Sequence, residues 1–479
     1  MVCIQCLTIK DTINNIGRLA EINGFIVMGT IWTPDLEAFI GPKYQRLVSA
    51  IEQGILCKTL PHGTKLPPQR RLADALGVTI GTVTRAYALA EQRGYVEARI
   101  GDGTYVNASP VPELSHLQLN MATCQQPLTD QISTLSDCLS QLAKDPAKLS
   151  QLLGYRASPL DQHQQVFHHW LLQRGIEQQP EQLIFTHGGQ QAIFACLNAF
   201  LTKGEVLLHE QYSYPGVRIC AKQLGINSIG VPLTADGVDL ARFEALVQIH
   251  QPKLVYLTLN NQNPTCIQYS EQQREKLLAL AEQYQFYIIE DDVNYSLPEE
   301  WHPPLWQLAQ TLNVPRVIYI SSLSKLFSGG LRQGFILVPE PLIAPLRLAI
   351  HSQCWMVSPL NVELACQLIK RGHITANRDA IIRARQQQCI ALGDKLGLTQ
   401  RWRGLNGWIQ LPEDIKAHHL VTALAAKGVL IRNGDDFNCH DNFIRLSLGG
   451  AENDTQFQLA LECIESTFSA LKQNAYSVV

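Results

Sequence analysis

The feature that most constrains the fold is an alternation of apolar runs with helical segments between residues 183 and 338. Six runs rich in β-branched and aromatic residues are predicted as strands, at residues 183–186, 205–209, 254–259, 286–290, 317–320 and 335–338. Helical patterns lie between them, at residues 190–201, 216–224, 240–247, 271–283 and 306–311. Strands that are apolar on both faces and are separated by helices pair in a mostly parallel sheet. We therefore expect a large α/β domain.

Polar motifs follow several of these strands, at the sheet edge where α/β proteins bind ligands. The motif Gly188-Gly189-Gln190 follows the first strand, and paired glycines let backbone N–H groups approach a phosphate. Tyr214 follows the second strand and offers an aromatic face to a flat ring. Asn263 offers an amide to a phenolic oxygen, and Asp291 a carboxylate to a pyridinium N–H. Each motif alone is more often structural, but their order at successive strand ends favours a ligand site.

One lysine, Lys325, stands in the turn between the last two strands. Burying an unpaired ammonium is costly, so such an amine is kept where its chemistry is used, for example in a Schiff base. The hydroxyl of Ser322 and the guanidinium of Arg332 suit a phosphate. A phosphorylated aldehyde would use all three groups, which predicts pyridoxal 5′-phosphate as the cofactor. The alternative is a strand–loop–strand with a solvated lysine.

A basic segment precedes the α/β region. Residues 42–106 hold nine basic and five acidic residues, a net charge of +4, which leaves −7 for the rest of a chain whose total is −3. A small basic domain beside an acidic body indicates a polyanionic partner.

The basic segment has the pattern of a winged helix-turn-helix. Helical spacing covers residues 44–55, 69–76 and 80–93, and a hairpin signal covers residues 95–106. The residues expected to contact operator DNA are Thr82, Thr84 and Arg85 at base edges, and Arg70, Arg71 and Arg99 at phosphates or the minor groove. The alternative is a small helical interaction domain.

The remaining boundaries follow from composition. Residues 1–40 are left unassigned, with Met28 as a possible start, and residues 41–107 form the winged domain. Residues 108–150 are predicted as a linker with a helical portion at residues 129–142, residues 151–354 as the large domain and residues 355–479 as a small α+β domain.

The cysteines indicate the compartment. Thirteen cysteines without a framework favour reduced thiols and a cytoplasmic protein. The pair Cys3 and Cys6 lacks two further ligands, so we expect no metal site. No apolar run approaches the ~20 residues that span a membrane, so we expect no membrane partner.

These motifs resemble known families. The run Ser322-Leu-Ser324-Lys325, with Arg332 and the strand-end motifs before it, resembles the fold type I aminotransferases of class I and II. The run Leu66-Pro-Pro-Gln-Arg-Arg-Leu-Ala73 and the run Gly101-Asp-Gly-Thr-Tyr-Val106 resemble the GntR-type DNA-binding domain. Together, residues 42–470 resemble the MocR group of GntR-type transcriptional regulators.

The aminotransferase resemblance implies a role for each motif residue. Lys325 would form the internal aldimine, Asp291 would meet the pyridine nitrogen, Asn263 the ring hydroxyl, and Tyr214 would stack on the ring. The residues implied around the phosphate are Gly188, Gly189, Gln190, Ser322 and Arg332.

The resemblance also implies a dimer and a substrate contact. Tyr155 would reach the partner's phosphate in a homodimer, and Arg445 would bind the α-carboxylate of a substrate. Asn294 stands where the family has a tyrosine on the ring oxygen, and an amide there would still donate a hydrogen bond. This departure, with Cys266 replacing a glycine, makes efficient transamination less expected than cofactor binding.

Three functions are compatible with the residues. The first is a cytoplasmic transcriptional regulator that senses pyridoxal 5′-phosphate, or an amine or amino acid that reacts with it, through Lys325. The second is an active aminotransferase with an appended DNA-binding domain, in which Lys325 is the proton-transfer base. The third is a structural relic that binds no cofactor.

Overall fold

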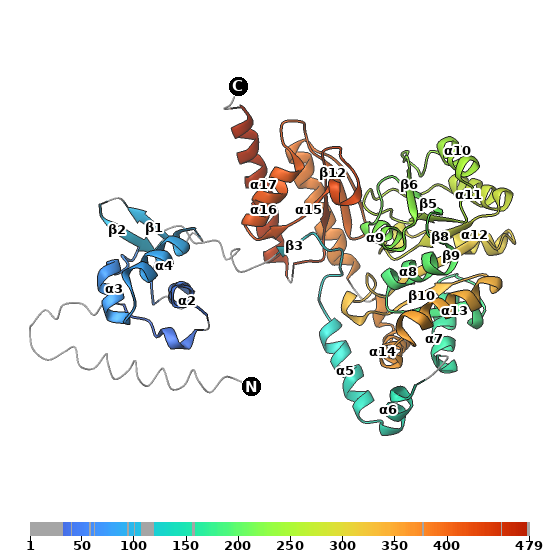
Figure 1. The fold of residues 1–479 in the computed structure, drawn as a ribbon, viewed down its shortest axis with the longest axis horizontal. Helices are drawn as coiled ribbons and strands as arrows, with labels where there is room; N and C mark the ends of the chain where they lie inside the picture. Colours follow the sequence, from blue (N-terminus) through green and yellow to red (C-terminus); the bar gives the residue numbers. More distant parts are fainter. Residues whose placement is uncertain are drawn as a thin grey trace, which may run out of the picture. The chain divides into compact units, whose positions relative to one another are not determined.

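The chain divides into two compact units, Met1–Ser115 and His116–Val479, and each is described by itself (Figure 1). The computed structural model describes residues 32–39, 41–56, 59–61, 63–92, 95–99, 101–106, 119–155, 159–375, 378–451 and 453–476. Met28, Cys3 and Cys6 lie outside these residues. Within the described part of the chain, no helix combines the length and apolar character needed to cross a membrane.

The first unit is three helices followed by a hairpin, as the sequence predicts. Its elements are η1 (Leu36–Ala38), α2 (Lys43–Leu56), α3 (Gln69–Leu76), α4 (Ile80–Gln92), β1 (Val96–Arg99) and β2 (Gly103–Val106). β1 and β2 are antiparallel, with Val96 opposite Val106. The core is formed by apolar residues of all three helices and the hairpin, among them Leu47, Ile51, Leu72, Val83 and Val106.

The turn between α3 and α4 is set by two local features. Gly77 ends α3 with φ of 60°, in the left-handed region that glycine adopts at low cost. The hydroxyl of Thr79 then accepts a hydrogen bond of 3.2 Å from the backbone N–H of Thr82, which satisfies one free donor at the start of α4. The tight turn holds the two helices at an angle, as in a helix-turn-helix.

The second unit is built on a seven-stranded sheet in the order β4-β10-β9-β8-β7-β5-β6. The strands are β4 (Leu183–Thr186), β5 (Val206–Glu210), β6 (Asn227–Val231), β7 (Leu254–Leu257), β8 (Tyr287–Asp291), β9 (Val317–Ser322) and β10 (Gly334–Leu337). β10 is antiparallel to both neighbours, and the other pairs are parallel. The mostly parallel sheet is therefore confirmed.

One strand was not predicted. β6 lies at the edge of the sheet and pairs only with β5 among the described strands. Its residues are largely exposed, and its short sequence contains Asn227, Ser228 and Gly230. An edge strand with little apolar surface to bury lacks the hydrophobic run that identifies the central strands.

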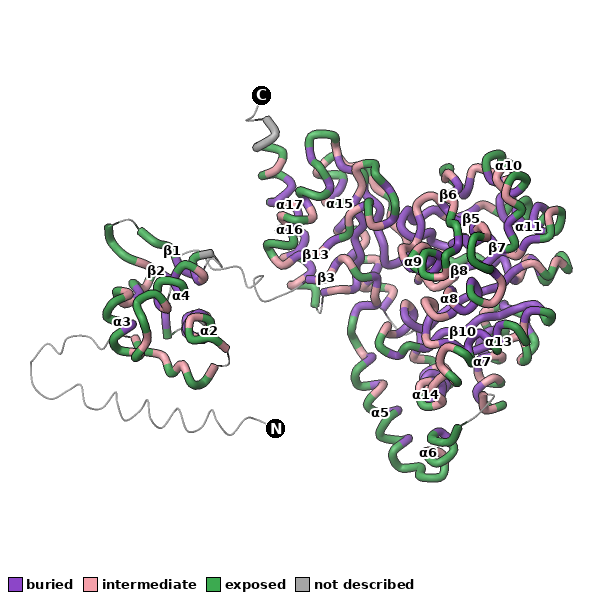
Figure 2. The backbone as a smooth tube through the Cα atoms, viewed as in Figure 1, coloured by how far each residue is buried: buried purple, intermediate pink, exposed green. Residues whose placement is uncertain are grey.

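Helices cover the sheet. They are α7 (Asp161–Gln173), α8 (Gly189–Phe200), α9 (Pro215–Leu224), α10 (Leu240–His250), α11 (Glu271–Tyr284), α12 (Leu305–Thr311) and α13 (Glu340–Cys354). Residues of α8, α9 and α13 share one buried cluster with the strand residues Tyr256, Ile289 and Ile320. α11 contacts α10 and α12, and α12 packs on β9. Figure 2 shows buried residues concentrated along the central strands.

The C-terminal part forms a second, smaller sheet in the order β11-β12-β15-β14. Its strands are β11 (Thr399–Arg403), β12 (Asn406–Gln410), β14 (Arg432–Asn433) and β15 (Phe443–Ser447). The accompanying elements are α14 (Pro359–Lys370), α15 (Asp379–Leu396), α16 (Ala417–Ala426), β13 (Val429–Leu430), η7 (Gly434–Phe437) and α17 (Asp454–Tyr476).

The predicted linker at residues 108–150 needs correction from residue 119 onward. β3 (Leu119–Asn120) pairs in parallel with β13, and α5 (Gln131–Ala143) contacts α14. α6 (Pro146–Leu153) follows α5. The buried residues of α5 recur at helical spacing, and they include the polar residues Gln131 and Thr134. The helical portion predicted at residues 129–142 corresponds to α5, whereas β3 depends on a distant strand partner, β13, and carries no local pattern of its own.

Candidate functional site

The carboxyl ends of β7, β8 and β9 open into a cavity of about 410 Å³. The cavity brings together most of the predicted site residues, which are distant in the chain: Gly189, Gln190, Tyr214, Asn263, Asp291, Asn294, Ser322, Lys325, Arg332 and Arg445. Gly188 lies against the guanidinium of Arg332, which lines the cavity. The sheet thus gathers the polar motifs at one edge, as strand order alone led us to expect.

Asp291 is the last residue of β8 and is buried in the cavity wall. One carboxylate oxygen accepts a hydrogen bond of 2.5 Å from the hydroxyl of Tyr256. The other, Oδ1, is buried and has no hydrogen-bond partner among the described residues. Desolvation raises the pKa of Asp291 to about 6. A protonated ring nitrogen beside Oδ1 would supply both the missing donor and the missing positive charge.

A second corner of the cavity contains groups that can bind an anion. Gly188 has φ of 80°, and a Cβ added there would lie 2.5 Å from Nη2 of Arg332. The guanidinium of Arg332 donates to the carbonyl of His187 at 2.9 Å. The N-terminus of α8 and the buried hydroxyl of Ser322 also lie at the cavity. Free helix N–H groups, a guanidinium and a hydroxyl are the usual partners of a phosphate.

Tyr214 and Gln190 form one wall together. The hydroxyl of Tyr214 donates a hydrogen bond of 2.9 Å to the side-chain oxygen of Gln190. A Cβ at Gly216 would lie 2.2 Å from both side chains, so this glycine is required for the contact. The ring of Tyr214 is thereby held at the cavity surface, where it can stack on a flat ligand.

Lys325 is half-buried and faces a segment that sequence reasoning missed. Its ammonium donates to the backbone carbonyl of Cys124. In return, the side-chain amide of Gln126 donates to the carbonyl of Lys325 at 2.7 Å. Residues 122–124 line the cavity. Lys325 meets this segment through the backbone carbonyl of Cys124, which any residue type would supply, so that contact leaves no mark in the sequence.

Arg445 lies on β15 and reaches the same cavity from the smaller sheet. Its guanidinium donates to the side-chain oxygen of Asn263 at 3.0 Å and to the backbone carbonyl of Ala122. It lies 5.0 Å from the ring centroid of Phe437, and its Nε has no partner among the described residues. A carboxylate entering the cavity would compete with the carbonyl of Ala122 for this guanidinium.

Two predicted residues are placed differently from the rest. Asn294 borders the cavity, but its amide nitrogen donates to the backbone carbonyl of Asn261 at 2.9 Å. Tyr155 does not line the cavity of its own chain: it is 84 % exposed and packs edge to face on Trp355 at 5.4 Å. The contact expected from Tyr155 in a partner subunit stays a prediction.

Sequence reasoning also missed Tyr256 and Arg432, which line the cavity. Tyr256 lies inside a predicted strand and pairs with Ile289 of β8, so the period of two places its side chain on the same face of the sheet as Asp291, which follows Ile289 by two residues. Arg432 belongs to a two-residue strand, β14, which carries no local pattern.

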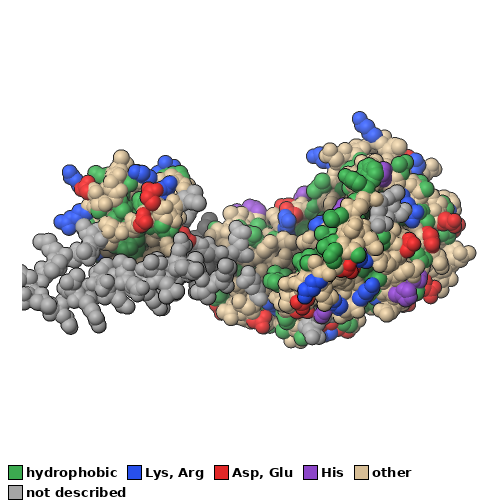
Figure 3. Space-filling view, turned by 90° about the horizontal axis from the view of Figure 1, so that it is seen from below, with side chains coloured by type: hydrophobic (Ala, Val, Ile, Leu, Met, Phe, Trp, Pro, Cys, Tyr) green, Lys and Arg blue, Asp and Glu red, His purple; other side chains and the backbone are tan. Residues whose placement is uncertain are grey.

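In the first unit, Thr84, Arg85, Arg70, Arg71 and Arg99 are exposed, and Thr82 is half-buried. The guanidinium of Arg85 lies 4.2 Å from the ring centroid of Tyr44, and that of Arg99 lies 4.5 Å from the ring of Tyr105. Arg70 and Arg71 have no hydrogen bond or ion pair from their guanidinium groups within the described part of the chain. Figure 3 shows Lys and Arg side chains on the surface of the smaller unit.

Comparison with known proteins decides the family. Residues 120–463 match the family "Aminotransferase class I and II". Residues 43–106 match "Bacterial regulatory proteins, gntR family". The chain belongs to the class I and II aminotransferase family and carries a gntR-family domain at residues 43–106.

The chain is similar over most of its length to proteins named as transcriptional regulators. It is 27% identical over 456 residues to YdeF of Bacillus subtilis, an uncharacterized HTH-type transcriptional regulator, covering 89% of this chain and 94% of the relative. It is 25% identical over 416 residues to MocR of Rhizobium meliloti, a probable rhizopine catabolism regulatory protein, covering 79% of this chain and 81% of the relative. The predicted resemblance to the MocR group is confirmed.

The second unit also matches solved structures. The α-aminoadipate aminotransferase LysN of Thermus thermophilus superposes with a TM-score of 0.68 at 23% identity, covering 82% of this chain and 99% of that one. This similarity shows the fold, and the fold implies pyridoxal 5′-phosphate. The first cavity fits that group, because it holds a buried carboxylate oxygen of Asp291 that has no partner among the described residues, and the anion corner at Gly188 and Arg332.

Proposed function

We propose that this protein is a DNA-binding transcription regulator that binds pyridoxal 5′-phosphate at Lys325 and detects the cofactor itself or a small amine or amino acid. The observation that carries the proposal is the pair of contacts made by one segment: the carbonyl of Cys124 accepts from Lys325, and the carbonyl of Ala122 accepts from Arg445. This segment leads along the chain, through residues 107–118, to the winged unit.

When bound, the cofactor would supply an aldehyde carbon that condenses with amines. The residues around it have separable tasks. Asp291 would hold the proton of the ring nitrogen, and Tyr214 would cover one face of the ring. Lys325 would provide the amine that anchors the group. The phosphate would lie between the start of α8 and Arg332, and Asn263 would meet the ring hydroxyl.

The signal would act through competition for hydrogen bonds. If Lys325 held the cofactor through its amine, that amine would no longer donate as an ammonium to the carbonyl of Cys124. Once an amino acid's carboxylate binds Arg445, the carbonyl of Ala122 loses its donor. Cys124 is buried and Ala122 half-buried, so loss of the donor at either carbonyl costs free energy, and ligand binding therefore opposes the contacts of residues 122–124. A ligand shifts an equilibrium by this kind of differential affinity.

The proposed assembly is a cytoplasmic homodimer. Exposed apolar side chains support the dimer. The exposed fractions are 73% for Ile132, 81% for Leu153, 84% for Tyr155 and 56% for Trp355. Two winged units in a dimer would bind two half-sites of an operator. The residues proposed to contact DNA are Thr82, Thr84 and Arg85 at bases, and Arg70, Arg71 and Arg99 at phosphates.

A second candidate is an active aminotransferase. It is favoured by the complete set of Lys325, Asp291, Asn263 and Arg445 in one cavity. The regulator is preferred because the chain joins this cavity to a gntR domain and because Asn294 has its amide bonded to a backbone carbonyl.

The test begins with the full chain incubated with pyridoxal 5′-phosphate. Wild type should show imine absorbance, and borohydride followed by peptide mapping should label Lys325. Lys325→Ala should lose both signals. A protein that stays colourless, or a label on another lysine, rejects the cofactor assignment.

The regulator and the enzyme are separated in the same samples. Mixing the holo-protein with single amino acids should change its affinity for the upstream DNA of its own gene, measured by fluorescence anisotropy. Rapid formation of pyridoxamine phosphate with multiple turnovers and unchanged DNA affinity would instead establish the aminotransferase.

A further inference from the structure

A second cavity, of about 700 Å³, lies beside the strand ends that carry the first one. Asp291 and Ser322 line the first cavity, whereas their neighbours Asp292 and Ser321 line the second. Successive residues of a strand point to opposite faces of its sheet, so the same strand ends supply both cavities. Val293 and Asn294 border both and form the wall between them.

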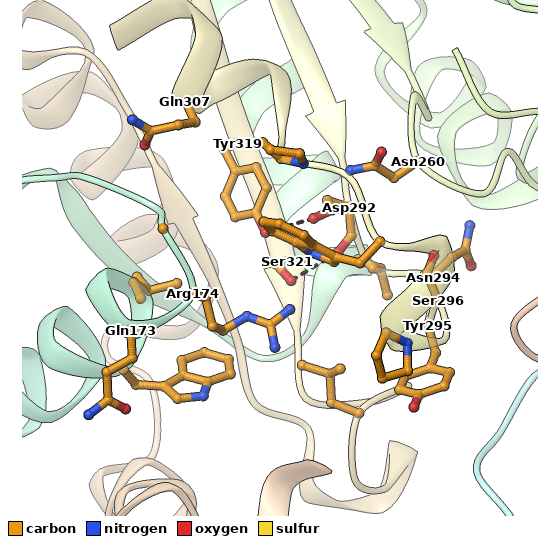
Figure 4. A pocket seen from close by; sticks show the side chains of 18 of the residues that line it. Gln173, Arg174, Asn260, Asp292, Asn294, Tyr295, Ser296, Gln307, Tyr319 and Ser321 are labelled. Atoms are coloured by element: carbon orange, nitrogen blue, oxygen red, sulfur yellow. Dashed lines mark hydrogen bonds between the residues drawn. The ribbon is translucent and has the colours of Figure 1, made fainter. Parts of the chain in front are cut away.

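The second cavity is lined by three charged side chains, Arg174, Asp292 and Asp379, and Arg174 acts on Asp292 electrostatically without forming an ion pair with it. Figure 4 shows the side chains of Arg174, at the end of α7, and Asp292 in this pocket. The guanidinium of Arg174 lies 5.3 Å from the ring centroid of Trp170. Among the described residues it has no hydrogen-bond acceptor and no ion pair. It is therefore a cation available to an entering anion.

Two hydrogen bonds hold Asp292 in place. Its carboxylate accepts a hydrogen bond of 2.9 Å from the hydroxyl of Tyr319, and its backbone carbonyl accepts one of 3.0 Å from the hydroxyl of Ser321. Both bonds are drawn in Figure 4. Desolvation raises the pKa of Asp292 above its ordinary value. A cationic donor beside this carboxylate would offset that desolvation.

Between the two charges the walls are largely aromatic and apolar. The residues that make them include Trp170, Tyr295, Trp301, Tyr319 and Phe335. Trp301 is 37 % exposed, so part of its indole remains accessible at the cavity. A large cavity with apolar walls and a few oriented polar groups has the composition of a small-molecule site.

We propose that this second cavity binds a free α-amino acid with an apolar or aromatic side chain, its carboxylate on Arg174 and its ammonium on Asp292. The site is separate from the one at Lys325, because neither Arg174 nor Asp292 lines the first cavity. It requires no covalent step and no cofactor. It therefore does not depend on the function proposed above.

The experiment must prevent binding at the first cavity. The full chain with Lys325→Ala and Arg445→Ala, prepared without pyridoxal 5′-phosphate, is titrated by calorimetry with three probes. L-Phenylalanine carries both charges, phenethylamine lacks the carboxylate, and 3-phenylpropionate lacks the ammonium. L-Phenylalanine should bind at least about tenfold more tightly than either analogue, because a charged hydrogen-bonding group is lost in each.

Variants in this background assign the two charges. Arg174→Gln should weaken L-phenylalanine about tenfold or more and leave phenethylamine unchanged. Asp292→Asn should weaken L-phenylalanine and phenethylamine and leave 3-phenylpropionate unchanged. Arg242→Gln, which removes an exposed charge on α10, should change none of the three.

Three results would overturn the proposal. One is the absence of binding heat when L-phenylalanine, L-tryptophan and L-leucine are titrated into the protein with Lys325→Ala and Arg445→Ala, in which the second cavity is unchanged. Another is equal affinity for L-phenylalanine and 3-phenylpropionate, which would indicate a general anion site. The third is an affinity for L-phenylalanine that Arg174→Gln leaves unchanged. The comparison of the three probes needs no change at Arg174 or Asp292, so it stands even if those variants fail to fold.

Discussion

The hydroxyl of Tyr256 donates a 2.5 Å hydrogen bond to Asp291, which ends the neighbouring strand, and the second oxygen of that carboxylate stays buried without a partner among the described residues. Desolvation raises the pKa of Asp291 to about 6, although the bond from Tyr256 opposes the shift. The free protein therefore holds a carboxylate that is unfavourable when ionised. A cofactor with a protonated ring nitrogen would relieve this, as is common at functional sites.

Asp291→Asn should stabilise the protein without cofactor at pH 8 and abolish retention of pyridoxal 5′-phosphate. A carboxyl pKa raised from 3.8 to about 6 means that folding stability falls as pH rises through this range. The full loss, about 3 kcal/mol, is reached above pH 6. Asparagine does not ionise, so its advantage should shrink at pH 5. Thermal unfolding of the second unit at both pH values checks this. An equal difference at pH 5 and pH 8 would contradict it.

Gly188→Ala should weaken binding of pyridoxal 5′-phosphate about tenfold or more. The added Cβ would lie 2.5 Å from Nη2 of Arg332 and push the guanidinium from the anion corner. Gly397→Ala is the control for a positive φ, because Gly397 has φ of 69° and open space around it. The backbone strain is about 1 kcal/mol at Gly397, which is left-handed helical, and about 1–3 kcal/mol at Gly188, whose φ of 80° and ψ of 173° are adopted readily by glycine alone. Equilibrium dialysis should show a loss of affinity in Gly188→Ala alone; the same loss in both would assign it to strain.

Arg445→Lys should reduce the response to amino acids and spare the response to simple amines. Arginine binds a carboxylate through two N–H groups, and lysine cannot reproduce that geometry. The loss expected is about tenfold or more in the concentration of amino acid needed to change the imine absorbance. An amine without a carboxylate should react as with wild type. If both ligands are weakened equally, Arg445 acts by positioning Asn263 and not by binding the carboxylate.

The winged unit should show two kinds of DNA contact. Arg85→Ala should cost about 1–3 kcal/mol on a specific operator and relax sequence preference. Arg70→Gln and Arg71→Gln should weaken all DNA sequences alike and each reduce the slope of log affinity against log salt by about 1. Anisotropy titrations at several salt concentrations distinguish them. Arg347→Gln on the second unit is the control for removal of one charge.

Local sequence patterns predicted much of the fold and many of the residues that line the first cavity. The central strands are apolar over their whole length, and α3 begins after Pro68 and ends at Gly77, so their bounds follow from neighbours in the chain. The polar residues at the strand ends could be grouped because parallel strands bring their carboxyl ends to one edge. The edge strand β6 and the short strand β3 were not predicted, because each depends on a partner strand more than on its own residues.

By itself, the sequence determined the order of helices and strands, the lysine between the last two strands, and the basic winged segment, because these are set by residue type and short-range spacing. Only the tertiary structure decided that the carbonyls of Ala122 and Cys124 meet Arg445 and Lys325, and that Arg174 faces Asp292 across a second cavity. Backbone carbonyls are chemically alike at every position, and the partners of a cavity are chosen by packing between segments far apart in the chain. Neither can be recognised before the chain has folded.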